Sequence, residues 1–289
     1  MLQKGDTIGI IALSGECDRE KVLNSKTFFE NLGYKIKLSK NIFECDRYLA
    51  GKDENKLNEL YDFFQNPEIK LILCARGGYG AIRLINGINY DLLKNNPKPF
   101  CGFSDVTALL LMIYKKSGII TYHAPMACVD FTENAPIGLT FTQENFFKTL
   151  NGEINSYNAD KTYKNGLAEG VLFGGNLSTV VSLCGLDFLP DEDFIFFAED
   201  VNEPVYKIDR MFQQLINTAK FKSNCKGLII GEFSGTDNEE WLDMYFYELT
   251  DKLNIPIVSM SKITHSKDKI TLPIGVKAKI LNDKFSFTI

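Results

Sequence analysis

Histidine and tryptophan are scarce in this sequence, whose 289 residues include two histidines and one tryptophan. The two histidines lie far apart, and the seven cysteines are scattered without a Cys-x-x-Cys pair, so the ligand spacing of a zinc site is missing. We therefore expect neither a catalytic metal nor a cofactor. A reaction that needs an imidazole base has only His123 and His265 to supply it.

Runs of basic residues are also missing. The formal net charge is -5 at pH 7, and no stripe of lysine and arginine alternates with aromatic residues, which argues against a nucleic-acid partner. Residues 1–15 lack the charged segment and long apolar core of a secretion signal, and no apolar run is long enough to span a membrane. We expect a cytoplasmic protein with no membrane partner.

The cysteines favour reduced, buried thiols. Their number is odd, they are widely separated, and Cys74 and Cys101 lie inside apolar runs. None stands on a turn that would expose a catalytic thiol, so we do not expect a cysteine nucleophile.

An alternation of apolar runs and helical patterns occupies the first half of the chain. Apolar runs at 7–12 and 69–75 predict buried strands, and helical spacing predicts helices at 19–32 and 56–65. This order predicts an α/β domain over residues 1–150, with a parallel sheet, helices on both of its faces and functional loops at the carboxyl ends of its strands.

The pattern changes after residue 150. The polar segment 151–166 is expected to be a linker, and residues 167–289 are expected to form a smaller, β-rich, barrel-like domain with apolar strands at 170–173 and 194–198. A helix near 205–215 is predicted from apolar residues at helical spacing, namely Val205, Ile208, Phe212 and Leu215.

Ser104 stands where a short apolar run gives way to a helical pattern. Such a strand-to-helix turn can expose a serine as a nucleophile, and the amide of Asp105 would then point toward a developing oxyanion. Gly102 lets the backbone pass close by. The alternative is that Ser104 only caps the helix that follows.

A glycine-rich turn, Arg76-Gly-Gly-Tyr-Gly80, follows the apolar run at 69–75. It is not a dinucleotide-binding fingerprint, because Arg83 stands where the third glycine belongs, and no phosphate-binding lysine follows. The turn can offer a backbone N–H to an anion, with Arg76 nearby for a carboxylate, or it can be a plain tight turn.

The candidates for a base and its carboxylate lie on different parts of the chain. His123 follows a short apolar strand, and His265 lies in a polar loop; either can also be purely structural. Glu199 ends an apolar run, where a carboxylate is well placed to orient an imidazole. Glu203 is the competing carboxylate, although it and Asp200 are also explained as polar residues at the start of the next helix.

Taken together, several motifs resemble those of the LD-carboxypeptidase family of serine peptidases, in the family's order and over nearly the whole chain. They are Leu2-Gln-Lys-Gly-Asp6, Tyr48-Leu-Ala-Gly51, Arg76-Gly-Gly-Tyr-Gly80, Gly102-Phe-Ser-Asp105 with Thr107, His123-Ala-Pro125, Gly174-Gly-Asn-Leu177, Glu199-Asp-Val201 with Asp209-Arg210, and His265 with Thr271-Leu-Pro-Ile-Gly275.

The resemblance implies a fold, a site and an activity. The fold is an N-terminal α/β domain of the flavodoxin-like or class I glutamine amidotransferase-like type and a C-terminal β-rich domain, commonly in a homodimer that needs no metal. Ser104 is implied as nucleophile, His265 as base and Glu199 as its orienting carboxylate. The amides of Gly78 and Asp105 are implied to form the oxyanion hole. The implied activity is release of a C-terminal D-alanine from L,D-linked murein tetrapeptides during cell-wall recycling.

Substrate contacts are expected from three further residues. Arg76 is the candidate partner of the substrate's terminal carboxylate, because an unpaired carboxylate in a closed cleft is costly. Tyr79, on the same turn, and His123, a wall residue of the same cleft, are expected to contact the substrate.

Two positions depart from the family pattern. Thr264 stands directly before His265, where the family usually has glycine, and Leu13 stands where proline is common. Two alternatives therefore stay open. One is a family member that hydrolyses a peptidyl-nucleotide antibiotic, which needs a platform for the nucleotide; the one tryptophan, Trp241, lies in a helical stretch. The other is a non-catalytic muropeptide-binding module in which Thr264 distorts the histidine loop.

Overall fold

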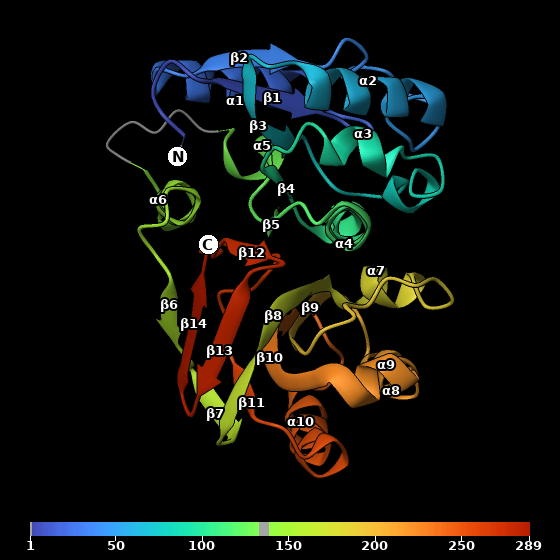
Figure 1. The fold of residues 1–289 in the computed structure, drawn as a ribbon, viewed down its shortest axis with the longest axis vertical. Helices are drawn as coiled ribbons and strands as arrows, with labels where there is room; N and C mark the ends of the chain where they lie inside the picture. The colour runs from blue at the N-terminus through green and yellow to red at the C-terminus, as the bar shows by residue number, and fades with distance from the viewer. Residues whose placement is uncertain (1, 133–138) are drawn as a thin grey trace. The chain divides into compact units, whose positions relative to one another are not determined.

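The computed structural model describes residues 2–132 and 139–289 of the chain (Figure 1). The chain forms two compact units, Met1–Glu153 and Ile154–Ile289. Within the described ranges, no helix is both long enough and apolar enough to cross a bilayer.

The first unit alternates strands and helices as predicted. In chain order its elements are β1 (Thr7–Ile11), α1 (Arg19–Asn31), β2 (Lys35–Leu38), α2 (Asp53–Gln65), β3 (Ile69–Cys74), a 3₁₀ turn (Ala81–Arg83), α3 (Tyr90–Lys94), β4 (Phe100–Gly102), a second 3₁₀ turn (Ser104–Val106), α4 (Thr107–Ser117), β5 (Thr121–His123), α5 (Ala127–Asp130) and α6 (Phe141–Leu150).

These strands pair in parallel, in the order β2-β1-β3-β4-β5. The order reverses between β1 and β3, and in open parallel sheets the loops that follow the two strands at such a switch point form a binding crevice. Here the two loops meet, because the amide of Gly15 after β1 donates to the carbonyl of Gly77 after β3 at 3.2 Å. The predicted α/β fold with a parallel sheet is confirmed, and the two loops expected to be functional lie together at this edge.

Helices cover both faces of this sheet. On one face, Ile8 and Ile10 of β1 belong to a buried cluster with Phe29 of α1 and Phe146 of α6. On the other face, Gly9 lies against α2 so closely that an added Cβ would be 2.7 Å from the Phe63 ring. Residues of β1 alternate between the two faces, as a strand buried on both sides requires.

The second unit is richer in strands. Its elements are β6 (Ser156–Asn158), β7 (Lys161–Lys164), β8 (Leu167–Asn176), α7 (Leu177–Ser182), β9 (Phe194–Val201), α8 (Val205–Ile216), α9 (Ala219–Asn224), β10 (Cys225–Ser234), α10 (Glu239–Leu253), β11 (Ile257–Ser259), β12 (Leu272–Ile274), β13 (Lys277–Leu281) and β14 (Lys284–Thr288). The segment 151–166, expected to be a linker, contains β6 and β7.

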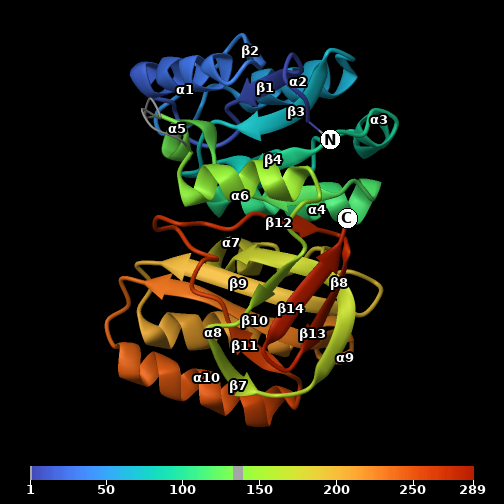
Figure 2. The same cartoon turned by 90° about the vertical axis from the view of Figure 1, so that its left-hand side faces the viewer.

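A mixed sheet in the order β6-β14-β13-β8-β9-β10-β11-β7 forms the body of this unit (Figure 2). Strands β8 to β11 pair in parallel at its centre, and antiparallel strands flank them on both sides. Helices α8 and α10 pack side by side against it. The apolar residues that predicted α8 are all buried: Val205, Ile208, Phe212 and Leu215.

Candidate functional site

Ser104 occupies a strained turn between β4 and α4. Its φ is 61°, in the left-handed region that non-glycine residues rarely adopt. The N-cap residue of α4 is Val106 rather than Ser104, so the interpretation of Ser104 as a plain helix cap is wrong. This is the strand-to-helix elbow that the sequence predicted, and it is typical of a serine nucleophile.

The glycine-rich turn after β3 packs directly on Ser104. A Cβ added at Gly77 would lie 2.9 Å from Ser104 Cβ, 3.0 Å from its Oγ and 3.5 Å from the Asp105 amide nitrogen. Gly78, with φ 116°, adopts a backbone conformation that suits glycine. The structure therefore brings together the two segments from which the oxyanion amides, those of Gly78 and Asp105, were predicted.

The Asp105 side chain ties these two segments to each other. Its Oδ2 accepts a hydrogen bond of 2.9 Å from the amide of Ala81, the first residue after the glycine-rich turn. The carboxyl group is buried, which raises its pKa, whereas this hydrogen bond and the positive charge of Lys56 act in the opposite direction. Asp105 thus has a structural task that the sequence did not reveal.

The other predicted residues of the first unit lie around this turn and along β5. Arg76 donates from its guanidinium to the carbonyl of Glu16 at 3.1 Å. Tyr79 is exposed, and its ring centroid is 5.8 Å from that of Tyr48, which is also exposed. His123 is buried on β5 and pairs in register with Gly102, two residues before Ser104.

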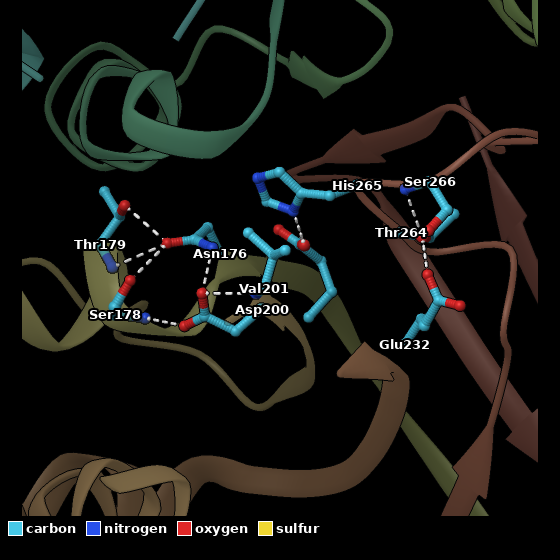
Figure 3. A network of polar contacts seen from close by, with 10 residues as sticks. Asn176, Ser178, Thr179, Asp200, Val201, Glu232, Thr264, His265 and Ser266 are labelled. Carbon is cyan, nitrogen blue, oxygen red and sulfur yellow. Dashed lines mark hydrogen bonds and ion pairs between the residues drawn. The ribbon is translucent and has the colours of Figure 1, made fainter. Parts of the chain in front are cut away.

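In the second unit, Glu199 and His265 meet. Glu199 lies on β9 with its side chain fully buried, and Nδ1 of His265 is hydrogen-bonded to its Oε2 (Figure 3). A carboxylate accepts, so Nδ1 carries the proton and Nε2 is left as the basic nitrogen. The resemblance to the LD-carboxypeptidase family implied this pair, although 66 residues separate its members.

The charges of this pair depend on each other. Burial raises the pKa of Glu199, and its hydrogen bond to His265 works against that rise. For His265, burial lowers the pKa, but the hydrogen bond and charge of Glu199, with the charge of Asp200, outweigh burial and raise it. A protonated His265 is therefore stabilised, as a general base that accepts a proton requires.

Comparison with protein families identifies the chain. A model described as the LD-carboxypeptidase N-terminal domain matches residues 8–124, and one described as the LD-carboxypeptidase C-terminal domain matches residues 169–280. The chain belongs to the LD-carboxypeptidase family. The predicted family and reaction class, a serine-type carboxypeptidase, are confirmed by this membership.

Relatives and solved structures agree with this assignment. A protein of Bacillus subtilis (strain 168) named "Probable murein peptide carboxypeptidase" is 33% identical over 96% of this chain and 89% of that protein. The "Microcin C7 self-immunity protein MccF" of Escherichia coli is 28% identical over 100% of this chain and 94% of that protein. The crystal structure of an MccF-like protein from Bacillus anthracis str. Ames superposes with a TM-score of 0.89, at 27% identity, covering 100% of this chain and 98% of that one.

Asp200 and Glu203, the other two carboxylates near Glu199 in the sequence, have other tasks. Asp200 does not start a helix: it lies on β9, and its buried carboxylate accepts from the Asn176 side chain at 2.9 Å (Figure 3). Glu203 precedes α8 and forms an ion pair of 3.2 Å with Lys207. Neither contact involves the imidazole of His265.

Asn176 belongs to the Gly174-Gly-Asn-Leu177 motif, but the sequence alone assigned it no role. It is the N-cap of α7, and its Oδ1 accepts from Thr179, while its amide group holds Asp200, the neighbour of Glu199. In the pairing of β8 with β9, Asn176 stands opposite Glu199. The Gly-Gly-Asn motif was the available signal, because asparagine is a preferred N-cap residue.

The cysteines were expected to be reduced, buried thiols, and no metal site was expected. All seven cysteines are free, but Cys45 is exposed and Cys17 and Cys184 are partly exposed, so the prediction of buried thiols is wrong for these three. Among residues 2–132 and 139–289, no three His, Cys, Asp or Glu side chains form a group that could hold a metal ion.

Proposed function

We propose that this protein is a serine carboxypeptidase that releases a C-terminal D-alanine from L,D-linked murein tetrapeptides. The observation that carries the proposal is the pairing of His265 Nδ1 with the buried carboxylate of Glu199, because it leaves Nε2 as a base of raised pKa. The relatives named murein carboxypeptidases support the choice of substrate.

In the proposed reaction, Nε2 of His265 takes the proton of the Ser104 hydroxyl as Oγ attacks the scissile carbonyl carbon. The amides of Gly78 and Asp105 donate to the resulting oxyanion. When the C–N bond breaks, His265 returns the proton to the leaving amine, and D-alanine departs. A water molecule then attacks the acyl-serine ester with His265 again as base, which restores the hydroxyl.

The substrate's terminal carboxylate is assigned to Arg76. Its guanidinium lies beside the glycine-rich turn, since a Cβ at Gly78 would be 3.8 Å from its Nη2. A planar guanidinium pairs well with a carboxylate, and removing this partner should weaken binding more than turnover. Contacts of Tyr79 and His123 with the substrate, a cytoplasmic location and a homodimer stay predictions.

The proposal is tested by measuring D-alanine release from tetrapeptides with lysine or diaminopimelate at the third position. Ser104→Ala and His265→Ala should reduce turnover by about 10⁴-fold or more. Ser182→Ala, which removes an exposed hydroxyl on α7, is the matched control and should keep full activity. Equal rates of D-alanine release by the wild type and the three variants would refute the proposal.

Covalent labelling separates catalysis from binding. A fluorophosphonate reacts with a serine whose hydroxyl is activated, so we expect a single adduct on Ser104 that is lost in His265→Ala. Tetrapeptide binding in calorimetry without hydrolysis and without an adduct would instead indicate the non-catalytic module. The contacts of Thr264 speak against that alternative, because His265 keeps its hydrogen bond to Glu199.

A second candidate substrate is a peptidyl-nucleotide. It is favoured by the likeness to the self-immunity protein and to solved structures of that protein, including one in complex with aspartyl sulfamoyl adenosine. The exposed rings of Tyr48 and Tyr79 offer aromatic faces beside the glycine-rich turn, whereas Trp241 lies on α10 of the other unit. Cleavage of a peptidyl-adenylate mimic more than about tenfold faster than the tetrapeptide, in kcat/KM, would favour this substrate.

A further inference from the structure

The hydroxyl of Thr264, the residue before His265, takes part in two hydrogen bonds. Thr264 is only 2% exposed, and its hydroxyl donates to Oε2 of Glu232 (Figure 3). The same oxygen accepts from the amide of Ser266 at 2.7 Å. One hydroxyl therefore links a carboxylate on β10 to the backbone that follows His265, and a glycine at this position could make neither bond.

Glu232 comes from a bulge that lies opposite Glu199. In the pairing of β10 with β9, Ile230 faces Ala198 and Phe233 faces Asp200, so two residues of β10, Gly231 and Glu232, face the single residue Glu199. A bulge of this kind turns side chains away from the regular alternation of a strand. Here it brings the Glu232 carboxylate to the histidine loop.

The backbone of the bulge also contacts the loop that carries His265. The amide of Glu232 donates to the carbonyl of Ile263 at 2.8 Å. A Cβ at Gly231 would lie 2.6 Å from that carbonyl oxygen and 2.9 Å from Glu199 Cβ, so only glycine fits there. One short stretch of β10, Gly231 and Glu232, therefore packs against both Glu199 and the loop that carries His265.

We propose that Glu232 and Thr264 are a positioning pair, which holds the His265 ring in the orientation that points Nδ1 at Glu199. The proposal rests on the proposed function, because the orientation matters for catalysis if His265 is the base. Neither residue touches the reacting atoms. The hydroxyl of Thr264 acts by fixing the backbone on both sides of the imidazole, and the carboxylate of Glu232 fixes the hydroxyl.

The effect on catalysis should appear in kcat. Thr264→Val keeps the shape of the side chain but removes the hydroxyl, and we expect kcat to fall about 10- to 100-fold with KM changed less than about twofold, as for other groups that orient a catalytic residue. Thr264→Ser keeps the hydroxyl and should restore kcat to within about threefold. Glu232→Gln loses the charge but keeps an acceptor oxygen, so its kcat should lie between those of Thr264→Val and Thr264→Ser.

A second measurement follows the histidine itself and needs no substrate. The chain has two histidines, so an NMR titration shows two imidazoles, and His265→Asn identifies which signal is His265. The charged groups that act on His265 are Glu199, Asp200 and Lys269. In Thr264→Val none of these changes, yet a loosened ring should lose part of its bond to Glu199, and the pKa of His265 should fall. The His123 signal should stay unchanged.

Thr250→Val is the matched control. Its hydroxyl donates to the carbonyl of Tyr247 at 2.7 Å within α10, so the variant loses a hydroxyl of the same unit away from the histidine loop. Kinetics and the His265 signal should both remain as in the wild type.

The two readouts distinguish the failure of each proposal. If the wild-type protein hydrolyses no tetrapeptide but the pKa of His265 falls in Thr264→Val, the positioning pair is supported and the proposed function is refuted. An unchanged His265 titration and an unchanged kcat in a folded Thr264→Val protein overturn the positioning pair. If Thr264→Val does not fold, the same measurements on Glu232→Gln decide, with thermal unfolding as the check on folding.

Discussion

A single methyl group at Gly77 should disable the enzyme although it removes none of the groups that take part in the proposed chemistry. In Gly77→Ala the new Cβ would lie 2.9 Å from Ser104 Cβ and 3.0 Å from its Oγ. Carbon atoms in contact prefer separations of about 3.5–4.0 Å. Because Ser104 already has a strained φ of 61°, relief must come from moving the serine or the glycine-rich turn by about 0.5–1 Å.

A displacement of this size has a calculable effect. Misplacing a reacting group by about 1 Å costs about 10²-fold in rate, which corresponds to about 2.7 kcal/mol in the activation barrier. Overpacking of a buried site costs about 1–3 kcal/mol of folding stability. We therefore expect Gly77→Ala to lose about 100-fold in kcat while it remains folded.

The assay is D-alanine release, with the rate of fluorophosphonate labelling of Ser104 as a second readout. Gly9→Ala is the matched control, because its Cβ would meet the Phe63 ring at 2.7 Å on the face covered by α2. It should lose similar stability but keep kcat within about twofold. A Gly77→Ala enzyme with kcat within about threefold of the wild type would refute the reasoning.

Further predictions concern the carboxylate, the arginine and the thiols. Glu199→Gln removes the carboxylate that raises the pKa of His265, so the acid limb of the pH profile of kcat/KM should move to lower pH, and the maximum of kcat/KM should fall about 10³- to 10⁴-fold. Glu203→Gln should lower kcat/KM much less. An acid limb that does not move in Glu199→Gln would contradict the assignment of Glu199. Arg76→Ala should raise KM at least about tenfold with kcat nearly unchanged, as initial-rate kinetics will show, whereas an equal loss in kcat would indicate another role. Disulfide reagents should modify exposed Cys45 first and the buried thiols only on unfolding: Cys74, Cys101, Cys128 and Cys225.

The fold of the first unit is predictable from sequence because its signals are local. Strands buried on both faces are continuous apolar runs, helices follow with their own spacing, and each change of pattern marks a boundary. Ser104 is found by the same logic, since a strand of three residues ends two positions before it and a helix follows. The elbow itself is therefore visible in the order of residue types.

The contacts that orient the second unit's site are not local. Glu232 and Thr264 are 32 residues apart, and their hydrogen bond depends on a bulge that exists only when β10 pairs with β9. Nothing in the apolar pattern of 225–234 indicates where the register shifts. The sequence shows Thr264 as a departure from the family pattern, but the effect of this residue on the histidine loop depends on its hydrogen bond to the Glu232 carboxylate. The same holds for Asp200, whose partner Asn176 lies on the neighbouring strand.

The left-handed backbone at residue 104 limits the chemistry that this fold can acquire. A side chain branched at Cβ is sterically disfavoured at such a φ, so threonine is a poor substitute there. Cysteine, unbranched like serine, is compatible with the same dihedral angle. A sulfur nucleophile should therefore replace the oxygen one at this position with little conformational cost, whereas a threonine nucleophile is disfavoured.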